Sequence, residues 1–277
     1  MPDQQPPRVL SAVVQNALAT HLRGLHKPGR PLLLTNAWDA ASATVLLRNP
    51  RTRAIATASY AIAAAHGVTD EALTLEQNLH SIQCVARAML PTAGSGSGGI
   101  PLTVDLQDGY GARLEEAVRA VVAAGAVGCN LEDVDTAGAL YPAQEAARRV
   151  AMALQVAVEM GIPDFVVNAR TDVLGAGRGT VEEVLERGRL YLAAGATTVF
   201  VWGGSGGRGV SGVEVRKLVE ALDGRVNVMM HLGKEFLGPK QLAEIGVARI
   251  SVGPALWRVA MSAFEAEAGR LLAELED

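Results

Sequence analysis

Eight short apolar segments recur along the chain, each ending in polar or acidic residues, and a helix-like stretch follows almost every one. The predicted strands span residues 31–36, 53–58, 101–106, 127–132, 165–170, 197–202, 226–231 and 248–252. In (β/α)8 barrels the active site gathers at the carboxyl ends of the parallel strands. The pattern therefore predicts an α/β protein, a TIM-type barrel in which residues 1–277 form one domain.

Helical periodicity fills the segments between the predicted strands. Residues 1–30 are expected to form an N-terminal helical segment, and residues 254–277 a C-terminal helix. One side of the N-terminal helix is expected to carry Leu10, Val13, Val14, Leu18 and Leu22. In a later helix, the apolar residues that share one face are Leu114, Ala117, Val118, Val121 and Val122.

Helix starts and stops carry recognisable signals. The capping-box spacing, in which side chains satisfy free amides of the first turn, occurs in the pairs Thr74/Gln77, Thr180/Glu183 and Ser211/Glu214. Ala-Ala-Gly-Ala precedes a predicted strand at 123–126 and again at 193–196, and Gly246 occupies a similar place. Glycine there accepts the left-handed conformation that ends a helix. The Gly/Ser-rich stretch 91–99 is expected to be a flexible loop.

Composition narrows the class of protein. The 277 residues are 49% hydrophobic and carry a net charge of -4, with no Lys/Arg cluster of the kind that binds nucleic acid. Two cysteines, Cys84 and Cys129, are too few for a disulfide framework or a zinc site. No signal peptide is expected, and no run approaches the roughly 18 apolar residues of a membrane span. We expect a soluble cytoplasmic protein that binds neither nucleic acid nor membrane.

Side-chain alternation along the strands selects the residues that face the barrel interior. If Asp105 points inward, the other inward residues are Thr103, Asn130, Glu132, Asn168, Arg170, Trp202, Asn227, Met229 and His231. Polar groups inside a barrel are costly unless they bind something. Their repetition at several strand ends favours a binding site over an accident of packing.

The residue types at these ends point to a particular chemistry. Asp105, Glu132 and Asp70 supply the oxygen ligands that Mg²⁺ prefers. Arg170 can hold a carboxylate through two parallel hydrogen bonds. Backbone amides of Ser59-Tyr60-Ala61, after the second strand, can hold an oxyanion. This combination suits a small 2-oxo or 2-hydroxy acid, whose bond cleavage leaves an enolate that a metal stabilises.

Six motifs at the predicted strand ends run through most of the chain. They are TNAWDAASA (35–43), TASYAIAAAHGVTD (57–70), VDLQDGYG (104–111), CNLEDVD (129–135), VNARTDVL (167–174) and ARISVGPAL (248–256). Each is modest alone, but together they resemble the isocitrate lyase/phosphoenolpyruvate mutase superfamily. The resemblance implies a barrel with Mg²⁺, or alternatively Mn²⁺, at the strand ends. It also implies 2-oxo-acid or enolpyruvate substrates, and a homotetramer, a dimer of dimers whose C-terminal helices swap between neighbours.

The resemblance also implies roles for individual residues. Asp105 would bind the metal directly, and Asp70 and Glu132 would act through metal-bound waters. The residues that it assigns to the substrate are Ser59, the amides of Tyr60 and Ala61, and Arg170. Catalysis is expected to involve Glu132, Arg170 and Ser59.

The chain departs from the superfamily's pattern at several positions. Gln107 stands where the superfamily usually has an acid, two residues after the metal-binding aspartate. As a neutral metal ligand it predicts weaker Mg²⁺ binding unless Asp108 compensates. The loop 134–141 lacks the Cys and His of the lyases and the Lys and Asn of the mutases. Trp202 stands where mutases have a histidine. The 134–141 loop is still expected to close over the ligand and exclude water.

Several other residues have two readings from sequence. Trp38 and Trp202 line the pocket or pack in the core. His231 is a proton carrier, with a place in the pocket, or a packed core histidine. Asp39 is expected to cap the following helix. Residues 203–209 (GGSGGRG) bind a distal carboxylate or phosphate through their amides, with Arg208 nearby, or form a loop without a ligand.

These observations favour a Mg²⁺-dependent lyase or decarboxylase that cleaves a C–C bond in a small 2-oxo or 2-hydroxy di- or tricarboxylate. Oxaloacetate, pyruvate and 2-oxoglutarate are the 2-oxo acids expected to bind. Three alternatives stay open. One is P–C bond chemistry of the phosphoenolpyruvate mutase or phosphonopyruvate hydrolase type, and another is a non-catalytic 2-oxo-acid binding protein. The third is a hydrolase with Ser205 as nucleophile, followed by Asp223 and His231.

Overall fold

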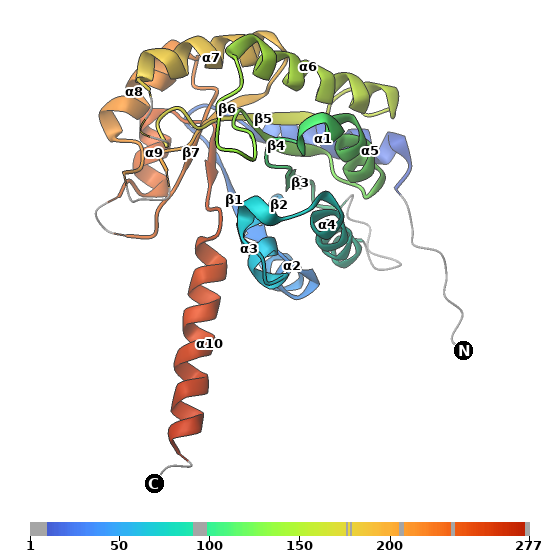
Figure 1. Ribbon diagram of the computed structural model, residues 1–277, viewed down its shortest axis with the longest axis vertical. Coiled ribbons are helices and arrows are strands. Elements are labelled where there is room, and N and C mark those ends of the chain that lie inside the picture. Colours follow the sequence, from blue (N-terminus) through green and yellow to red (C-terminus); the bar gives the residue numbers. More distant parts are fainter. Residues whose placement is uncertain are drawn as a thin grey trace.

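The strands close into a parallel barrel (Figure 1), seen in a computed structural model that describes residues 10–90, 99–175, 177, 179–204, 208–233 and 236–274. They are β1 (Leu32–Ala37), β2 (Ile55–Thr57), β3 (Leu102–Asp105), β4 (Gly128–Glu132), β5 (Val166–Thr171), β6 (Thr198–Val201), β7 (Val226–Met229) and β8 (Arg249–Ser251). Every strand pairs with its successor, and β8 pairs with β1 through Leu32↔Arg249. The predicted TIM-type barrel is confirmed. Trp202 and His231 lie just beyond the shortened β6 and β7.

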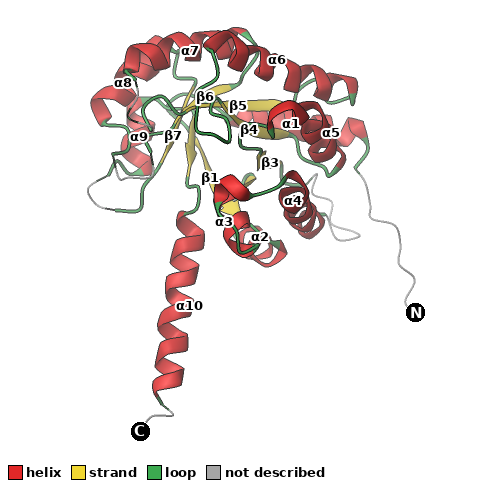
Figure 2. Cartoon of the chain, viewed as in Figure 1, coloured by secondary structure: helices red, strands yellow, loops and turns green. Residues whose placement is uncertain are grey.

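Helices separate the strands and cover the barrel (Figure 2). They are α1 (Ala12–Leu25), α2 (Ala40–Leu47), α3 (Ser59–Ala65), α4 (Leu75–Met89), α5 (Leu114–Ala123), α6 (Ala143–Glu159), α7 (Val181–Ala193), α8 (Gly212–Ala221), α9 (Pro239–Ile245) and α10 (Ala255–Ala273). Short 3-10 turns occupy Asp70–Ala72 and Gly111–Arg113. Within the described residues, no helix is long and apolar enough to cross a membrane.

The helix α5 shows how the sequence pattern specifies packing. Its buried residues are Leu114, Ala117, Val118, Val121 and Val122, as the periodicity predicts. The opposite face carries ion pairs, including Arg119 with Glu115. The helix stops at Gly125, whose φ of 100° lies in the left-handed region that disfavours side chains. This stop turns the chain directly into β4 and so places Glu132 at the far end of that strand.

The N-terminal helix α1 packs with a different face from the one expected. Val13 is 81% exposed and Val14 is also exposed, so the prediction that they join the buried side is wrong. Leu18 and Leu22 are buried, together with Gln15. The Gln15 amide group donates to the carbonyls of Val122 and Ala126, at 2.7 and 2.9 Å. A polar residue thus occupies the buried face because two carbonyls at the end of α5 need donors.

The last helix, α10, projects away from the barrel (Figure 1). None of its residues is buried. The large apolar side chains exposed along it are Val259, Met261, Phe264, Leu271 and Leu272. A 19-residue helix with no packed face is only marginally stable in water. An apolar surface of this kind is typical of a contact with another protein chain.

Candidate active site

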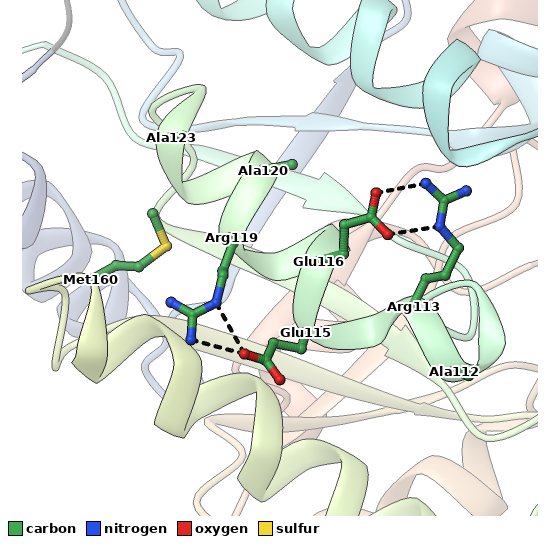
Figure 3. A pocket seen from close by; sticks show the side chains of 8 residues that line it. All are labelled: Ala112, Arg113, Glu115, Glu116, Arg119, Ala120, Ala123 and Met160. Carbon is green, nitrogen blue, oxygen red and sulfur yellow. Dashed lines mark hydrogen bonds and ion pairs between the residues drawn. The ribbon is translucent and has the colours of Figure 1, made fainter.

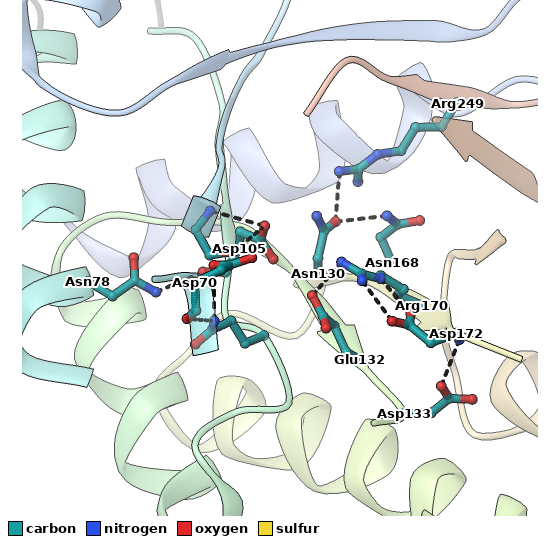
Figure 4. Close-up of polar contacts among 12 residues, drawn as sticks. Asp70, Asn78, Asp105, Asn130, Glu132, Asp133, Asn168, Arg170, Asp172 and Arg249 are labelled. Carbon is teal, nitrogen blue, oxygen red and sulfur yellow. Dashed lines mark hydrogen bonds and ion pairs between the residues drawn. The ribbon is translucent and has the colours of Figure 1, made fainter. Parts of the chain in front are cut away.

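Asp105, at the carboxyl end of β3, is held from three directions (Figure 4). Its amide donates to the hydroxyl of Thr57 at 2.9 Å, and its carbonyl accepts from the side-chain amide of Asn78, also at 2.9 Å. One carboxylate oxygen, Oδ2, accepts from both the amide and the hydroxyl of Ser59 at 3.2 Å. The other, Oδ1, is buried and has no partner among the described residues. The side chain therefore presents one fixed, unsatisfied oxygen.

Asp70 lies beside Asp105, in the 3-10 turn that precedes α4. Its carbonyl and its Oδ1 accept hydrogen bonds from the side-chain amide of Gln107, at 2.6 and 3.2 Å. Burial, reinforced by the charge of Asp105, raises the pKa of Asp70 to about 6. Gln107 itself has a φ of 51°, in the left-handed region. In this structure the side-chain NH₂ group of Gln107 is hydrogen-bonded to Asp70.

Arg170 joins two acids at the end of β5. It is the register partner of Glu132 on β4, and Nη1 donates to Glu132 Oε1 at 2.6 Å. Its Nε and Nη2 donate to the two oxygens of Asp172, at 2.6 and 2.8 Å. The guanidinium also lies 4.3 Å from the ring centre of Trp202. Three of the five guanidinium N–H groups are thereby used, which leaves two for a ligand.

The charges around these residues bear on whether a cation fits between them. Burial raises the pKa of Glu132 well above its ordinary value; Arg170 opposes this, whereas Asp172, Asp105 and Asp70 add to it. Across the described ranges, no three His, Cys, Asp or Glu side chains converge closely enough to enclose a metal by themselves. Mg²⁺ requires less, because it is often bound by one or two carboxylates and completed by water. The orphaned Asp105 Oδ1, with Asp70 and Glu132 behind it, fits such an ion.

The segment Ser59-Tyr60-Ala61 begins α3 directly above β2. The Ser59 amide and hydroxyl both serve Asp105, and the Ala61 amide donates to the Ala58 carbonyl at 3.1 Å. The Ala61 amide therefore already has a partner in this structure, and its role as an oxyanion donor stays a prediction. The Tyr60 amide has no partner among the described contacts. A ligand at this helix start therefore has one ready backbone donor.

The loop after β4 forms a small hairpin. Val134 and Leu140 pair in antiparallel fashion, and the Asp135 carboxylate accepts from the amides of Ala137 and Ala139. The hairpin leads to Tyr141, whose hydroxyl donates to Asp108 Oδ2 at 2.7 Å. The two titratable residues of 134–141 are thus engaged, Asp135 by its own turn and Tyr141 by Asp108, so neither is free to act as a general acid in this structure.

The carboxylate of Asp108 stabilises the turn that follows it through hydrogen bonds to backbone amides. It accepts from the Tyr110 amide through Oδ1 and from the Gly111 amide and Tyr141 hydroxyl through Oδ2. With both oxygens occupied, Asp108 does not replace the acid that Gln107 displaced.

The remaining predicted residues surround this centre. Trp38 packs against the cluster of Ile62, Ala63 and Leu73, and its neighbour Asp39 caps α2 through the Ser42 amide at 2.7 Å, as predicted. His231 lies 4.7 Å from Phe236, ring centre to ring centre. Burial and the positive charge of Arg258 lower the pKa of His231.

The glycine-rich loop is described only in part. Arg208 is paired with Glu214 at 2.6 Å, a contact that directs its guanidinium toward α8. Ser205, the nucleophile of the hydrolase alternative, lies outside the described residues.

A buried polar layer lies deeper in the barrel. Asn130 Oδ1 accepts from Asn168 at 2.8 Å and from the Arg249 guanidinium at 3.0 Å, and Asn168 accepts from Thr198 at 2.6 Å. These inward residues therefore bond to one another, which the alternation pattern alone did not reveal, although Nε and Nη1 of Arg249 are buried without a partner among the described residues. Arg249 was missed because its position reads as the middle of a short apolar strand. Asp172 was also missed, although an acid two residues after Arg170 on one strand is a simple signal.

A hollow lies on the outer, helical side of the barrel (Figure 3). It is open and lined by residues of η2, α5 and the end of α6, with Arg113 paired to Glu116 and Arg119 to Glu115. Because its charges are paired with each other, this hollow offers no convergent polar group to a ligand.

The arrangement at the strand ends is accompanied by a clear family relationship. Residues 22–272 match the family of phosphoenolpyruvate phosphomutase, and the chain belongs to that family. A crystal structure from Burkholderia cenocepacia J2315, described as a phosphonomutase, is 36% identical in sequence. It covers 92% of this chain and 99% of its own, with a TM-score of 0.80. The chain is therefore a member of the phosphoenolpyruvate mutase/isocitrate lyase superfamily of enzymes, as the six motifs predicted.

More distant structures share the fold. A phosphonopyruvate hydrolase in complex with oxalate and Mg²⁺ is 23% identical, covers 93% of this chain and 87% of its own, and has a TM-score of 0.77. A 2,3-dimethylmalate lyase is 24% identical, covers 92% of this chain and 87% of its own, and has a TM-score of 0.76. One barrel thus accommodates both P–C and C–C bond chemistry.

Proposed function

We propose that this protein is a Mg²⁺-dependent enzyme, able to use Mn²⁺ instead, that cleaves a C–C bond in a small 2-oxo or 2-hydroxy di- or tricarboxylate. The observation that carries the proposal is the buried, unpartnered Oδ1 of Asp105, next to Asp70 and Glu132. Three acids with so little counter-charge need a cation. A bound divalent ion supplies Lewis acidity at the oxygens of a 2-oxo acid.

The protein's own residues then orient the substrate. Ser59, Thr57 and Asn78 fix Asp105, so its free oxygen keeps one direction. Arg170 is pre-positioned by Asp172 and Glu132, and its two unused N–H groups bind the C1 carboxylate. The Tyr60 amide donates to the developing oxyanion. Trp202 excludes water from the face of Arg170 on which it stacks.

Cleavage of a P–C bond is the second candidate, and the comparisons support it equally. The matched family is named for a phosphomutase, and one structural neighbour is a phosphonopyruvate hydrolase. Phosphonopyruvate carries the same 2-oxo-acid end as oxaloacetate, so the Asp105 and Arg170 end of the site fits both. The difference between the two activities lies at the other end of the substrate.

The test is a thermal-shift screen with and without Mg²⁺, followed by product analysis. The ligands are pyruvate, oxaloacetate, 2-oxoglutarate, oxalate, isocitrate, 2-methylisocitrate and phosphonopyruvate. We expect Mg²⁺-dependent stabilisation by 2-oxo acids and turnover of one of them by C–C cleavage. Turnover of phosphonopyruvate alone establishes the second candidate. Stabilisation without any product instead makes the protein a 2-oxo-acid binding protein.

A variant pair tests the metal assignment. Asp105→Ala is expected to abolish the Mg²⁺-dependent shift and the activity, because it removes the unpartnered oxygen, while the protein still unfolds cooperatively. Glu115→Gln, a change in a surface acid of α5, is expected to retain both. Undiminished Mg²⁺-dependent activity in Asp105→Ala overturns the metal assignment.

We also propose that the protein assembles as a homotetramer, a dimer of dimers in which α10 packs on a neighbouring copy. The support is the exposed apolar stripe of α10, which includes Phe264, and the marginal stability of an isolated helix of this length.

A further inference from the structure

Aromatic and cationic residues gather on one arc of the barrel mouth. Tyr60 follows β2, His231 follows β7, and Trp257 and Arg258 lie in the first turn of α10, after β8. The strands run β7–β8–β1–β2 around the barrel, so these segments are neighbours at its carboxyl end. We refer to Tyr60, His231, Trp257 and Arg258 as the rim cluster.

Contacts within the rim cluster fix the position of Arg258. Its guanidinium lies 5.0 Å from the ring centre of Tyr60, in cation–π geometry. The Tyr60 ring meets Trp257 edge to face, with centroids 5.9 Å apart. On its other side, the charge of Arg258 is felt by His231, whose pKa it helps to lower. Arg258 therefore lies between the β2 and β7 sides of the mouth, stacked on the Tyr60 ring, which in turn contacts Trp257.

The guanidinium of Arg258 has no acid beside it within the part of the chain that the structure describes. Among the described residues it makes no ion pair and no hydrogen bond, whereas Arg170 is clamped by Glu132 and Asp172 and Arg208 by Glu214. A cation stacked on one aromatic ring, with its N–H groups unused by the described residues, is suited to bind an anion. The residue on which it stacks, Tyr60, directly follows the Ser59 that contacts Asp105.

We propose that Arg258 binds the distal carboxylate of a dicarboxylate substrate whose 2-oxo-acid end lies at Asp105 and Arg170. This inference rests on the proposed function and adds the residue that determines specificity at the substrate's other end. Tyr60 stacks on the guanidinium, and Trp257 packs against the Tyr60 ring. Substrates without a second carboxylate leave Arg258 unused, so they bind through the Arg170 end alone.

The experiment compares matched ligands on Arg258→Gln and wild-type protein. Affinities are measured by thermal-shift titration, with and without Mg²⁺, for oxaloacetate against pyruvate and for 2-oxoglutarate against 2-oxobutanoate, with oxalate as a reference. We expect Arg258→Gln to weaken binding of the two dicarboxylates about 10- to 100-fold, the range for a lost hydrogen-bonded charge contact. Binding of pyruvate, 2-oxobutanoate and oxalate is expected to stay within about twofold.

Control variants separate recognition from structure. Arg216→Gln removes an exposed arginine of α8 outside the site and is expected to bind all five ligands like wild type. Arg258→Lys is expected to recover part of the dicarboxylate affinity, because the charge is kept. Sedimentation of each variant shows whether a change at the start of α10 has altered assembly.

Each outcome is decisive. Equal loss for all five ligands gives Arg258 a purely structural role and overturns the inference. Unchanged dicarboxylate binding in Arg258→Gln, with oxalate still bound in the presence of Mg²⁺, overturns this inference and leaves the proposed function standing. Selective dicarboxylate loss without any effect of Mg²⁺ supports Arg258 and contradicts the metal-dependent function. Wild-type protein that binds none of the five ligands overturns both.

Discussion

His26, which ends α1, is a neutral imidazole in a place that disfavours charge. Its Nδ1 lies 2.8 Å from the Leu22 carbonyl and so carries the proton, while Nε2 is buried without a partner. Burial, together with the nearby charge of Arg249, lowers the pKa of His26 from 6.5 to about 3. Protonation would add a second cation beside a buried arginine, so folding excludes it.

This residue predicts a specific loss of stability in acid. Below pH 6.5 the unfolded chain binds a proton that the folded chain does not accept until about pH 3. The free energy of unfolding therefore decreases by roughly 1.4 kcal/mol for each pH unit between these values. In urea unfolding at pH 7.5 and 5.0, His26→Gln is expected to lose less stability than wild type. His21→Gln, which changes an exposed histidine of the same helix, should follow wild type; equal pH dependence of all three proteins contradicts the assignment.

The sequence pointed to the candidate site residues more readily than to their hydrogen-bond partners. Asp105, Glu132 and Arg170 could be found because each ends an apolar strand, where barrel chemistry collects. Their pairing was harder to foresee, since it depends on strand register and on turns. Asp172, two residues further along the chain, accepts a hydrogen bond from Arg170. Asn78, in a helix 27 positions before Asp105, donates a hydrogen bond to its carbonyl. Contacts of this kind follow from three-dimensional packing and leave no local pattern.

Among the elements, strands and inter-strand helices were predicted well, and the face of α1 was not. Alternation and helical periodicity predict the buried face well when one side of an element meets only apolar neighbours and the other side only solvent, as in α5. In α1, the apolar Val13 and Val14 are exposed to solvent and the polar Gln15 is buried. The reason is that the face of α1 that packs on the barrel meets backbone carbonyls at the end of α5, and these need a hydrogen-bond donor.

The contact between α1 and β4 predicts opposite effects of two glycine substitutions. A Cβ at Gly128, the first residue of β4, would lie 2.7 Å from the Val166 carbonyl oxygen and 3.2 Å from Leu22. Since backbone cannot yield, Gly128→Ala is expected to lower the free energy of unfolding by about 1–3 kcal/mol. A Cβ at Gly24, inside α1, meets nothing within 4 Å, so Gly24→Ala should raise it by about 0.5–1 kcal/mol. Urea titration measures both, and destabilisation by Gly24→Ala would count against this account of α1.

At the scale of the whole molecule, α10 stands apart from the barrel that the other elements form. Its apolar residues recur at helical spacing from Trp257 through Met261 and Phe264 to Leu271, which places them along one face. Within the described part of the chain, Trp257 contacts Tyr60, whereas Met261, Phe264 and Leu271 beyond it stay exposed. The barrel closes without the part of α10 that follows the rim cluster, so assembly and folding are expected to be separable.

Charge substitution on α10 tests this separation. Phe264, 71% exposed, lies on the apolar stripe, and Phe264→Asp is expected to dissociate the proposed tetramer while the circular dichroism of the barrel persists. Ser262→Asp adds the same charge on the opposite face and should leave the assembly intact. Sedimentation velocity distinguishes the species. A wild-type chain that sediments as a monomer refutes the assembly.

The hydrogen bonds of α1 also have a consequence for the order of events during synthesis. The side chain of Gln15 donates to carbonyls that are synthesised 107 and 111 residues later, and that of Asn16 donates to Asp164, 148 residues later. At translation rates of about 5–20 residues per second, the first helix to emerge stays without its partners for roughly 5–30 seconds. Its leucine face is exposed throughout that interval. The beginning of the nascent chain is therefore where a chaperone has the longest opportunity to act.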